Sequence, residues 1–153
     1  MATETKLRQL ADKGCPVYYF YSSERYLVRQ AVTAITRILT ADSDEDATVL
    51  DGAAPEIEQL IMAAGTISFF GTRRVVVLPE IDPAAYSDKD LEELNSTLSS
   101  LENAVVVLGS VFELERSKLK TGKRAQKLIA QCKALGYTEE LAKPKPFELK
   151  MMM

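Results

Sequence analysis

The chain has 153 residues, of which 46% are hydrophobic and 27% charged, and these values suit a single globular domain with a sizeable core. Its net charge of −3 gives no support to attraction of the whole domain to nucleic acid, so a contact with DNA would need a local basic patch. The sequence holds no histidine and two well-separated cysteines, Cys15 and Cys132, which excludes imidazole chemistry and argues against a zinc site.

Signals for export and for membrane insertion do not occur in the sequence. The N-terminal residues MATETKLRQLADKG lack the apolar core of a signal peptide. No apolar run approaches the roughly 18 residues that a membrane span needs. We therefore expect a cytoplasmic protein without membrane contact, with two free thiols and no cofactor.

Apolar β-rich runs alternate with helical patterns from the start of the chain. Val17–Tyr21 is short, continuous and rich in β-branched and aromatic residues, which predicts a strand buried on both faces. A helix is predicted over Glu24–Leu39, with Ser22 or Ser23 capping its first turn. The apolar residues of this helix recur at three- and four-residue spacing and form one stripe: Leu27, Ala31, Ile35 and Ile38.

The middle of the chain repeats this order. A second short strand is predicted at Thr48–Asp51, and Pro55 can open the helix that follows it. The core stripe expected for this helix consists of Ile57, Leu60, Ile61 and Ala64. The run Arg74–Ile81 predicts a third strand, which ends at Pro79.

The second half of the chain predicts two further helices and two further strands. The first helix has an apolar stripe of Leu91, Leu94, Leu98 and Leu101. Ala104–Ser110 is expected to be a buried strand closed by Gly109, and a helix follows over Lys118–Ala134. The apolar side of that helix holds Ala125, Leu128, Ile129 and Cys132. Gly136 is a good helix stop, and Tyr137–Leu141 is the fifth predicted strand.

This alternation predicts an α/β fold with an open, mostly parallel five-stranded sheet and helices on both faces. Residues 1–141 would form this domain. The composition changes at AKPKPFELK, which holds two prolines, so we expect residues 142–153 to be a linker or the truncated start of a following domain.

In such a fold a ligand binds at the carboxyl ends of the strands. A nucleotide site needs a glycine-rich loop after the first strand, followed by Lys and Ser or Thr. Here that loop reads YSSERYL, and Glu24 would place a negative charge where a phosphate should lie. Glu80 and Asp82, after the third strand, could serve Mg²⁺ only beside a phosphate, so we interpret them as solvated loop acids. We expect no enzymatic activity from this degenerate P-loop.

Three segments, in this order and spacing, resemble the delta subunit family of the bacterial DNA polymerase III clamp loader. They are VYYFYSSERYLVRQA, TVLDGAAPEIEQLIMAAGTISFFGTRRVVVLPEID and AVVVLGS with the basic helix after it. The resemblance covers about Pro16 to Leu141. It implies an AAA+-like (RecA-like) domain without a nucleotide site, the first of three domains. The implied partners are the sliding clamp (the beta subunit) and the other clamp-loader subunits.

In that family an apolar pair after the second helix grips the clamp, and the matching segment here is Ile67, Ser68, Phe69, Phe70 and Gly71. If the preceding helix continued, Phe69 would lie about 120° and Phe70 about 220° from the centre of its core stripe. In an extended chain the two rings would point to opposite sides. A turn at Gly65 or Gly71 could still bring both rings into the core. The resemblance favours at least one exposed ring, which would bind the clamp and favour ring opening.

Basic residues gather in the stretch RSKLKTGKRAQK. Five of them are candidate contacts to a DNA backbone or to another loader subunit: Arg116, Lys118, Lys120, Lys123 and Arg124. A solvated helix face is the simpler interpretation. The stretch holds no aromatic residue that could stack on bases, so we expect no sequence-specific reading of nucleic acid.

One function from a different class stays open. A small cytosolic α/β nucleotide-binding domain, or a phosphoacceptor domain with an unrecognised site, would have a similar size and number of strands. A phosphoacceptor needs an acidic pair directly after the first strand, and this chain offers only Glu24 there.

Overall fold

The computed structural model describes residues 4–12, 14–41, 46–65, 74–101, 104–116 and 118–141, with the backbone alone at 4–6 and 10. The helices in this part are α1 (Glu4–Asp12), α2 (Arg25–Thr40), α3 (Ile57–Gly65), the 3-10 turn η1 (Pro83–Ala85), α4 (Asp88–Ser99) and α5 (Gly122–Leu135). The strands are β1 (Val17–Ser22), β2 (Thr48–Val49), β3 (Arg74–Leu78), β4 (Ala104–Val111), β5 (Leu114–Glu115), β6 (Lys118–Leu119) and β7 (Tyr137–Glu140).

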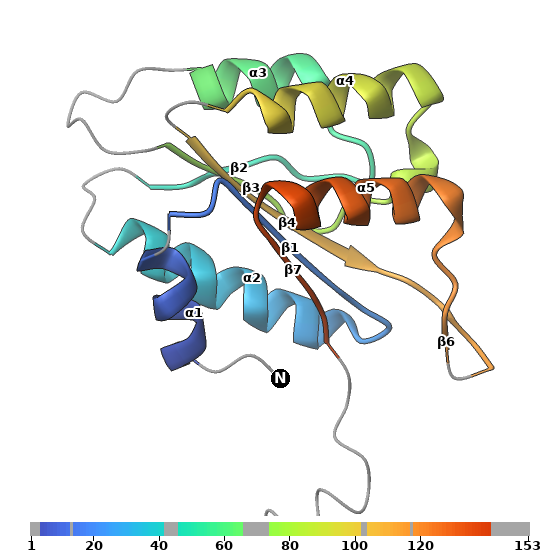
Figure 1. The fold of residues 1–153 in the computed structure, drawn as a ribbon, viewed down its shortest axis with the longest axis horizontal. Coiled ribbons are helices and arrows are strands. Elements are labelled where there is room, and N and C mark those ends of the chain that lie inside the picture. Colours follow the sequence, from blue (N-terminus) through green and yellow to red (C-terminus); the bar gives the residue numbers. More distant parts are fainter. Residues whose placement is uncertain are drawn as a thin grey trace, which may run out of the picture.

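Five strands form one open sheet in the order β2-β3-β4-β1-β7, and each neighbouring pair is parallel. The central pair joins β1 to β4 over six residues, from Val17 opposite Val106 to Ser22 opposite Val111. The predicted five-stranded α/β sheet is therefore confirmed. Because every strand runs in the same direction, the loops that follow β1, β3 and β4 meet at one edge of the sheet (Figure 1).

Helices cover both faces of the sheet, as predicted (Figure 1). On one face α1 and α2 pack on Tyr18 and Phe20 of β1, together with the alternate valines of β3 and β4. On the other face α3, α4 and α5 pack on Val17 and Tyr19. Successive side chains of a strand point to opposite faces, so the continuous apolar run of β1 supplies both cores.

Two expectations about helix starts and helix number need correction. The chain forms a helix, α1, before the first strand, and no such helix was predicted. Neither serine caps α2 as expected, because Glu24 is its N-cap residue and makes no side-chain capping bond. Ser22 instead accepts a hydrogen bond from the N–H of Glu24 at 3.0 Å, within the turn before the helix.

The predicted core stripe of α3 was wrong at Ile61, which is 51% exposed. Ile57 and Leu60 are buried, and Ala63 and Ala64 are partly buried against the same core cluster. These residues centre the buried stripe on the Leu60 side of the helix, and Ile61 then lies about 90° from that centre at 100° per residue. The α3 stripe is narrower and rotated relative to the prediction.

The region after β4 also differs from the prediction. Gly109 does not close β4 but lies within it, since the strand continues to Val111. The expected start of the last helix at Lys118 was wrong, because Lys118–Leu119 pairs with Leu114–Glu115 in the antiparallel hairpin β5–β6 and α5 begins at Gly122. Cross-strand pairing of Leu114 with Leu119 stabilises this hairpin, and the positive φ of Gly122 turns the chain into the helix.

Within the described ranges the chain has neither a membrane-spanning helix nor a cluster of metal-ligating side chains. No helix there has the length and apolar character that crossing a membrane would require. In the same residues, no group of three or more His, Cys, Asp or Glu side chains could hold a metal ion. Cys15 and Cys132 are free thiols and pack into the cores on opposite faces of the sheet.

Candidate functional site at the carboxyl ends of the strands

A hollow of about 850 Å³ opens where the loops after β1, β3 and β4 meet. Its walls come from the start of α2, the segment after β3, the hairpin β5–β6 and the start of α5. We call it the strand-end hollow. In α/β folds of this type a ligand occupies this place, so the contacts of its polar side chains bear directly on function.

The connection from β1 to α2 consists of only two residues, Ser23 and Glu24. A phosphate-binding loop of the P-loop type spans several residues and wraps successive backbone N–H groups around the phosphates. Here the N–H of Glu24 is already bonded to the Ser22 hydroxyl. The connection is too short to wrap a phosphate, which agrees with the degenerate P-loop expected from the sequence.

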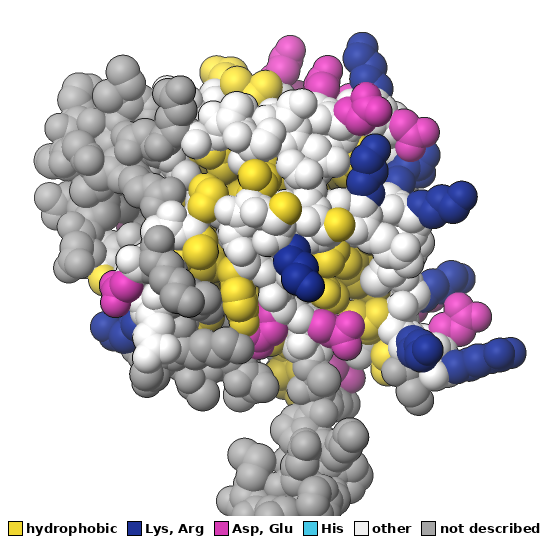
Figure 2. Space-filling model, in the orientation of Figure 1, with side chains coloured by type: hydrophobic (Ala, Val, Ile, Leu, Met, Phe, Trp, Pro, Cys, Tyr) yellow, Lys and Arg dark blue, Asp and Glu magenta, His cyan; other side chains and the backbone are white. Residues whose placement is uncertain are grey.

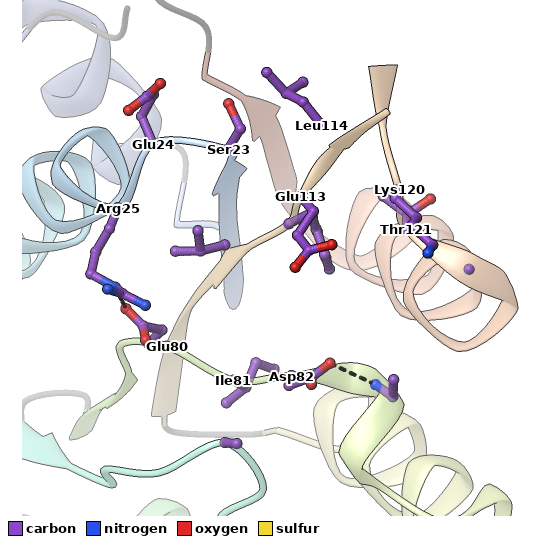
Figure 3. A pocket seen from close by; sticks show the side chains of 15 residues that line it. Ser23, Glu24, Arg25, Glu80, Ile81, Asp82, Glu113, Leu114, Lys120 and Thr121 are labelled. Atoms are coloured by element: carbon purple, nitrogen blue, oxygen red, sulfur yellow. Dashed lines mark hydrogen bonds and ion pairs between the residues drawn. The ribbon is translucent and has the colours of Figure 1, made fainter. Parts of the chain in front are cut away.

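One ion pair crosses part of the strand-end hollow. Arg25, the first residue of α2, donates from Nε to Oε1 of Glu80 at 2.6 Å (Figure 3). The two side chains come from residues 55 positions apart in the sequence. They are 58% and 39% exposed, so solvent screens the pair and its contribution to stability is small. We expected Glu80 to be a solvated loop acid. It is instead partly exposed and forms an ion pair with Arg25 of the same chain.

The second acid after β3 has a structural role. Asp82 is the N-cap of η1, and its Oδ1 accepts a hydrogen bond from the N–H of Ala84 at 3.0 Å (Figure 3). The backbone N–H of Asp82 donates to the carbonyl oxygen of Ala53 at 2.7 Å. Asp82 is exposed, as expected for a loop acid, and it also fixes the chain where β3 passes into α4.

A buried hydrogen-bonded chain lies beneath the hollow. The hydroxyl of Ser110, at the end of β4, donates to the carbonyl oxygen of Ile81 at 2.8 Å. Because its only proton is used there, Ser110 accepts the hydrogen bond from the hydroxyl of Tyr19 at 2.6 Å. Burial raises the pKa of Tyr19 far above its ordinary value, so this phenol stays protonated. Ser110 thus holds the segment after β3 and has no side-chain atom exposed to the hollow.

Close backbone packing reinforces this arrangement. A Cβ atom at Gly109 would lie 2.4 Å from the carbonyl oxygen of Pro79 and 2.8 Å from Cγ1 of Val28. The N–H of Ile81 also donates to the carbonyl oxygen of Gly109 at 2.8 Å. Glycine is therefore required at this position so that the segment after β3 can lie directly on β4.

Arg124, one of the predicted basic contacts, is used within the fold. Its Nε donates to Oδ1 of Asp88 at 3.0 Å, and its Nη1 donates to the carbonyl oxygen of Ala84 at 3.5 Å. These bonds join the start of α5 to η1 and to the start of α4. Of the other four predicted contacts, Arg116 and Lys118 lie in the hairpin, Lys120 follows it on the wall of the hollow, and Lys123 is in the first turn of α5.

Comparison with known protein families matches residues 18–135 to "DNA polymerase III, delta subunit". The chain belongs to this delta subunit family. A curated relative, DNA polymerase III subunit delta from Bacillus subtilis (strain 168), is 28% identical over 137 residues. The alignment covers 81% of this chain and 39% of the relative, so the chain spans about two fifths of that protein's length. The resemblance seen in the sequence is confirmed.

The delta subunit match runs from β1 to the end of α5, so it includes the strand-end hollow and the hairpin. It also includes Ile67, Ser68, Phe69, Phe70 and Gly71, which lie outside the described residues. The described chain reaches Gly65, and α3 leads towards this segment with two large apolar side chains in solvent: Ile61, 51% exposed, and Met62, 73% exposed.

Proposed function

We propose that this domain is the clamp-binding part of a DNA polymerase III delta subunit. In this proposal segment 67–71 grips the sliding clamp, the beta subunit, and the other clamp-loader subunits are neighbours of the full-length protein. Membership of the delta subunit family carries the proposal. The exposure of Ile61 and Met62 in α3 supports it, because it places apolar surface seven to nine residues before Phe69 and Phe70 in the chain.

Exposed apolar side chains of this size favour burial against a partner. Burial of apolar surface contributes about 25 cal/mol per Å², and one well-placed aromatic anchor can contribute about 2 kcal/mol or more to an interface. Partner proteins commonly bind the apolar face of a helix in a groove, or bind an extended segment. A helix that is followed by an apolar segment can be bound in either way. The proposed anchors are Phe69 and Phe70, and Ile61 and Met62 precede them on α3.

Ring opening requires no chemistry in this domain. A binder that prefers the distorted clamp to the closed clamp shifts the equilibrium by the ratio of its two affinities. The two-residue connection between β1 and α2 supports a role without nucleotide, because it offers no loop that could surround phosphates. The domain would therefore act through binding energy alone.

The first experiment measures binding of the chain to immobilised sliding clamp. Phe69→Ala/Phe70→Ala should weaken binding by at least about 30-fold, because removal of an anchor that contributes about 2 kcal/mol has that effect. The matched control is Tyr26→Ala/Val49→Ala, which removes two exposed apolar side chains elsewhere, 50% and 52% exposed. Equal loss of affinity in both double variants, or full retention in the first, would overturn the assignment of the site.

A second measurement addresses ring opening. The chain should bind more tightly to a clamp whose ring interface has been weakened by substitution than to a clamp whose interface has been cross-linked shut. Equal affinities would contradict ring opening while leaving clamp binding intact. Titration with ATP·Mg²⁺ in the same buffer should give no heat, and saturable binding there would favour the nucleotide-binding alternative.

A further inference from the structure

The main concentration of positive charge in the sequence borders the strand-end hollow. Residues 116–127 hold six of the chain's 19 lysines and arginines and none of its 22 acids, so this stretch carries +6 in a chain of net charge −3. Five of the six cations are exposed, and we call them the basic edge: Arg116, Lys118, Lys120, Lys123 and Lys127.

The hairpin and the first half of α5, which follow one another in the chain, carry these five residues. Figure 2 shows dark blue side chains along the border where β6 and the start of α5 lie in Figure 1. Lys123 and Lys127 are four residues apart on α5 and therefore lie on one side of it. Arg116, Lys118 and Lys120 precede them within and after the hairpin. The strip continues from the tip of the hairpin onto the helix.

The basic edge differs from the other cations of this region in lacking partners. Arg25 is bound to Glu80 and Arg124 to Asp88. In the part of the chain that the structure describes, none of the five basic-edge side chains forms an ion pair or a side-chain hydrogen bond. Glu115 is the cross-strand neighbour of Lys118 in the hairpin, but the two side chains form no ion pair. The positive potential of the strip is thus left largely unneutralised.

Arg116 stands at a position that does not suit arginine. Its φ of 54° lies in the left-handed region, which Gly and Asn adopt at a turn far more readily. The chain nevertheless carries a long cation at the tip of its hairpin. A residue held in an unfavourable conformation at an exposed tip is better explained by contact with a partner than by stability of the turn.

The form of the basic edge fits phosphate better than an acidic protein surface. Thr121, the N-cap of α5, gives no side-chain cap to the N–H groups of the first turn, and no acid lies in that turn. Phosphate groups bind such N–H groups and lysines together. Leu114 is the one large apolar side chain of the described hairpin that is more than half exposed, whereas a protein interface usually has an apolar core.

We propose that the basic edge binds the phosphodiester backbone of nucleic acid without reading its sequence. Lys118, Lys120, Lys123 and Lys127 would each neutralise a phosphate, and Arg116 would extend the contact at the hairpin tip. Arg124 does not take part, because Asp88 already holds it. This surface is independent of segment 67–71, so clamp binding and nucleic-acid binding can each fail without the other.

The test uses fluorescence anisotropy of a short labelled DNA duplex of mixed sequence. Lys118→Gln/Lys120→Gln/Lys123→Gln should lower affinity at least tenfold at low salt. It should also reduce the slope of log affinity against log salt by about 2 to 3, because each lost phosphate contact removes about 0.9 from that slope. The matched control is Arg29→Gln/Arg37→Gln/Lys133→Gln, which removes three exposed charges from other surfaces and gives the same net charge.

The outcomes divide cleanly. Loss of DNA affinity in the first triple variant and retention in the control supports the basic edge. Equal loss in both variants would mean attraction through net charge alone and would overturn the assignment, as would absence of binding by the unsubstituted chain. A poly-glutamate peptide that binds as tightly as DNA, with the same dependence on the three lysines, would indicate an acidic protein partner instead.

A single substitution separates binding from folding. Arg116→Asn removes one charge and supplies a residue that tolerates the left-handed conformation. DNA affinity should fall severalfold while the urea midpoint of unfolding stays unchanged or rises. A fall in stability together with unchanged affinity would show that Arg116 serves the turn and not a partner.

Discussion

The strand-end hollow and the basic edge are neighbours, and Lys120 belongs to both, but they use their polar side chains in opposite ways. In the hollow, Glu80 is held by Arg25, Asp82 caps η1, and Ser110 is bonded to Tyr19 and to Ile81. Along the basic edge, five cations carry no ion pair in the described chain. The hollow lies where α/β folds of this type bind their ligands, but its acids and its buried serine already have partners. The basic edge lies beside it and has cations without an ion-pair partner in the described chain.

This difference shows why residue type at a familiar position is a poor guide to chemistry. Acids and a serine at the ends of β3 and β4 are the residue types that handle metal and phosphate in related folds. Here each already has a partner within the chain, and those bonds tie α2, β1, β4 and η1 to the segment after β3. The hollow is better understood as part of the structural frame, with contacts to other molecules assigned to surfaces around it.

The largest expected effect tests how closely the segment after β3 packs on β4. Gly109→Ala should lower the free energy of unfolding by about 3 kcal/mol, because the added Cβ would overlap the carbonyl oxygen of Pro79. Urea denaturation measures the change. Gly65→Ala is the control, since a Cβ there would meet nothing within 4 Å. Because Gly→Ala lowers the entropy of the unfolded chain, the control should keep or slightly gain stability. A comparable loss in both variants would mean that the contact with Pro79 does not set the cost.

The next effect concerns the buried hydrogen bonds beneath the hollow. Ser110→Ala should cost about 2 kcal/mol, because it leaves the Tyr19 hydroxyl and the Ile81 carbonyl oxygen without their partner. Thermal and urea unfolding report the loss. Ser99→Ala, which removes an exposed hydroxyl bonded to Ser96, should change stability by less than about 0.5 kcal/mol. If Ser110→Ala is equally silent, Ser110 does not hold the frame together.

Alkaline pH should weaken the fold through its buried acids. Burial raises the pKa of Cys132 to about 12, and burial, helped by Asp90, raises that of Tyr86 to about 12. The unfolded chain loses these protons near the ordinary pKa values of 9 and 10, while the folded chain keeps them. Stability should therefore fall as pH rises from about 9 to about 12.

Urea unfolding at a series of pH values checks this decline. Tyr86→Phe should cost about 1 kcal/mol near neutral pH, because Pro55 loses the hydrogen bond from the Tyr86 hydroxyl. The free energy of unfolding of this variant should decline less steeply above about pH 10, because the Tyr86 hydroxyl, which loses its proton at lower pH in the unfolded chain than in the folded chain, is absent. An unchanged slope would assign the alkaline loss to the other groups whose pKa burial raises, which are Cys132, Tyr19 and Tyr21.

The smallest effect tests the exposed ion pair of the hollow. Arg25→Gln should lower stability by about 0.5 kcal/mol or less, with a smaller effect at high salt, because solvent screens both partners. The double variant with Glu80→Gln completes a cycle that isolates the pair. DNA affinity should be nearly unchanged, since Arg25 lies outside the basic edge. A tenfold loss of DNA affinity would mean that the hollow is part of the DNA-binding surface. The distinction between the hollow and the basic edge would then be wrong.

The fold could be predicted from the sequence because long apolar runs and clear helical stripes dominate it. β1, β3 and β4 are continuous apolar segments, and α2 and α4 have leucine- and isoleucine-rich stripes that were found buried at Leu27, Ile35, Leu91, Leu94 and Leu98. Short elements escaped prediction. The hairpin has two residues in each strand, too few for any periodicity to show, so its lysines were assigned to the following helix.

The candidate site was predictable only in part. The missing glycine-rich loop was visible in the sequence, and the structure adds that the connection is two residues long. The partners of the acids were not visible, because Arg25 and Glu80 lie 55 positions apart and only the folded sheet brings them together. The clamp-binding assignment of Phe69 and Phe70 came from family resemblance and stays a prediction, since those residues lie outside the described ones.

The length of the turn between β1 and α2 also determines which changes in sequence could give this domain a nucleotide-binding site. A P-loop has eight positions, with residue identity fixed at four of them. Substitutions alone cannot create it between Ser22 and Arg25, because two residues cannot supply the required backbone. An engineered ATP site would need an insertion at this turn and release of Glu80 from Arg25. Random point mutation should therefore never convert this domain into an ATPase.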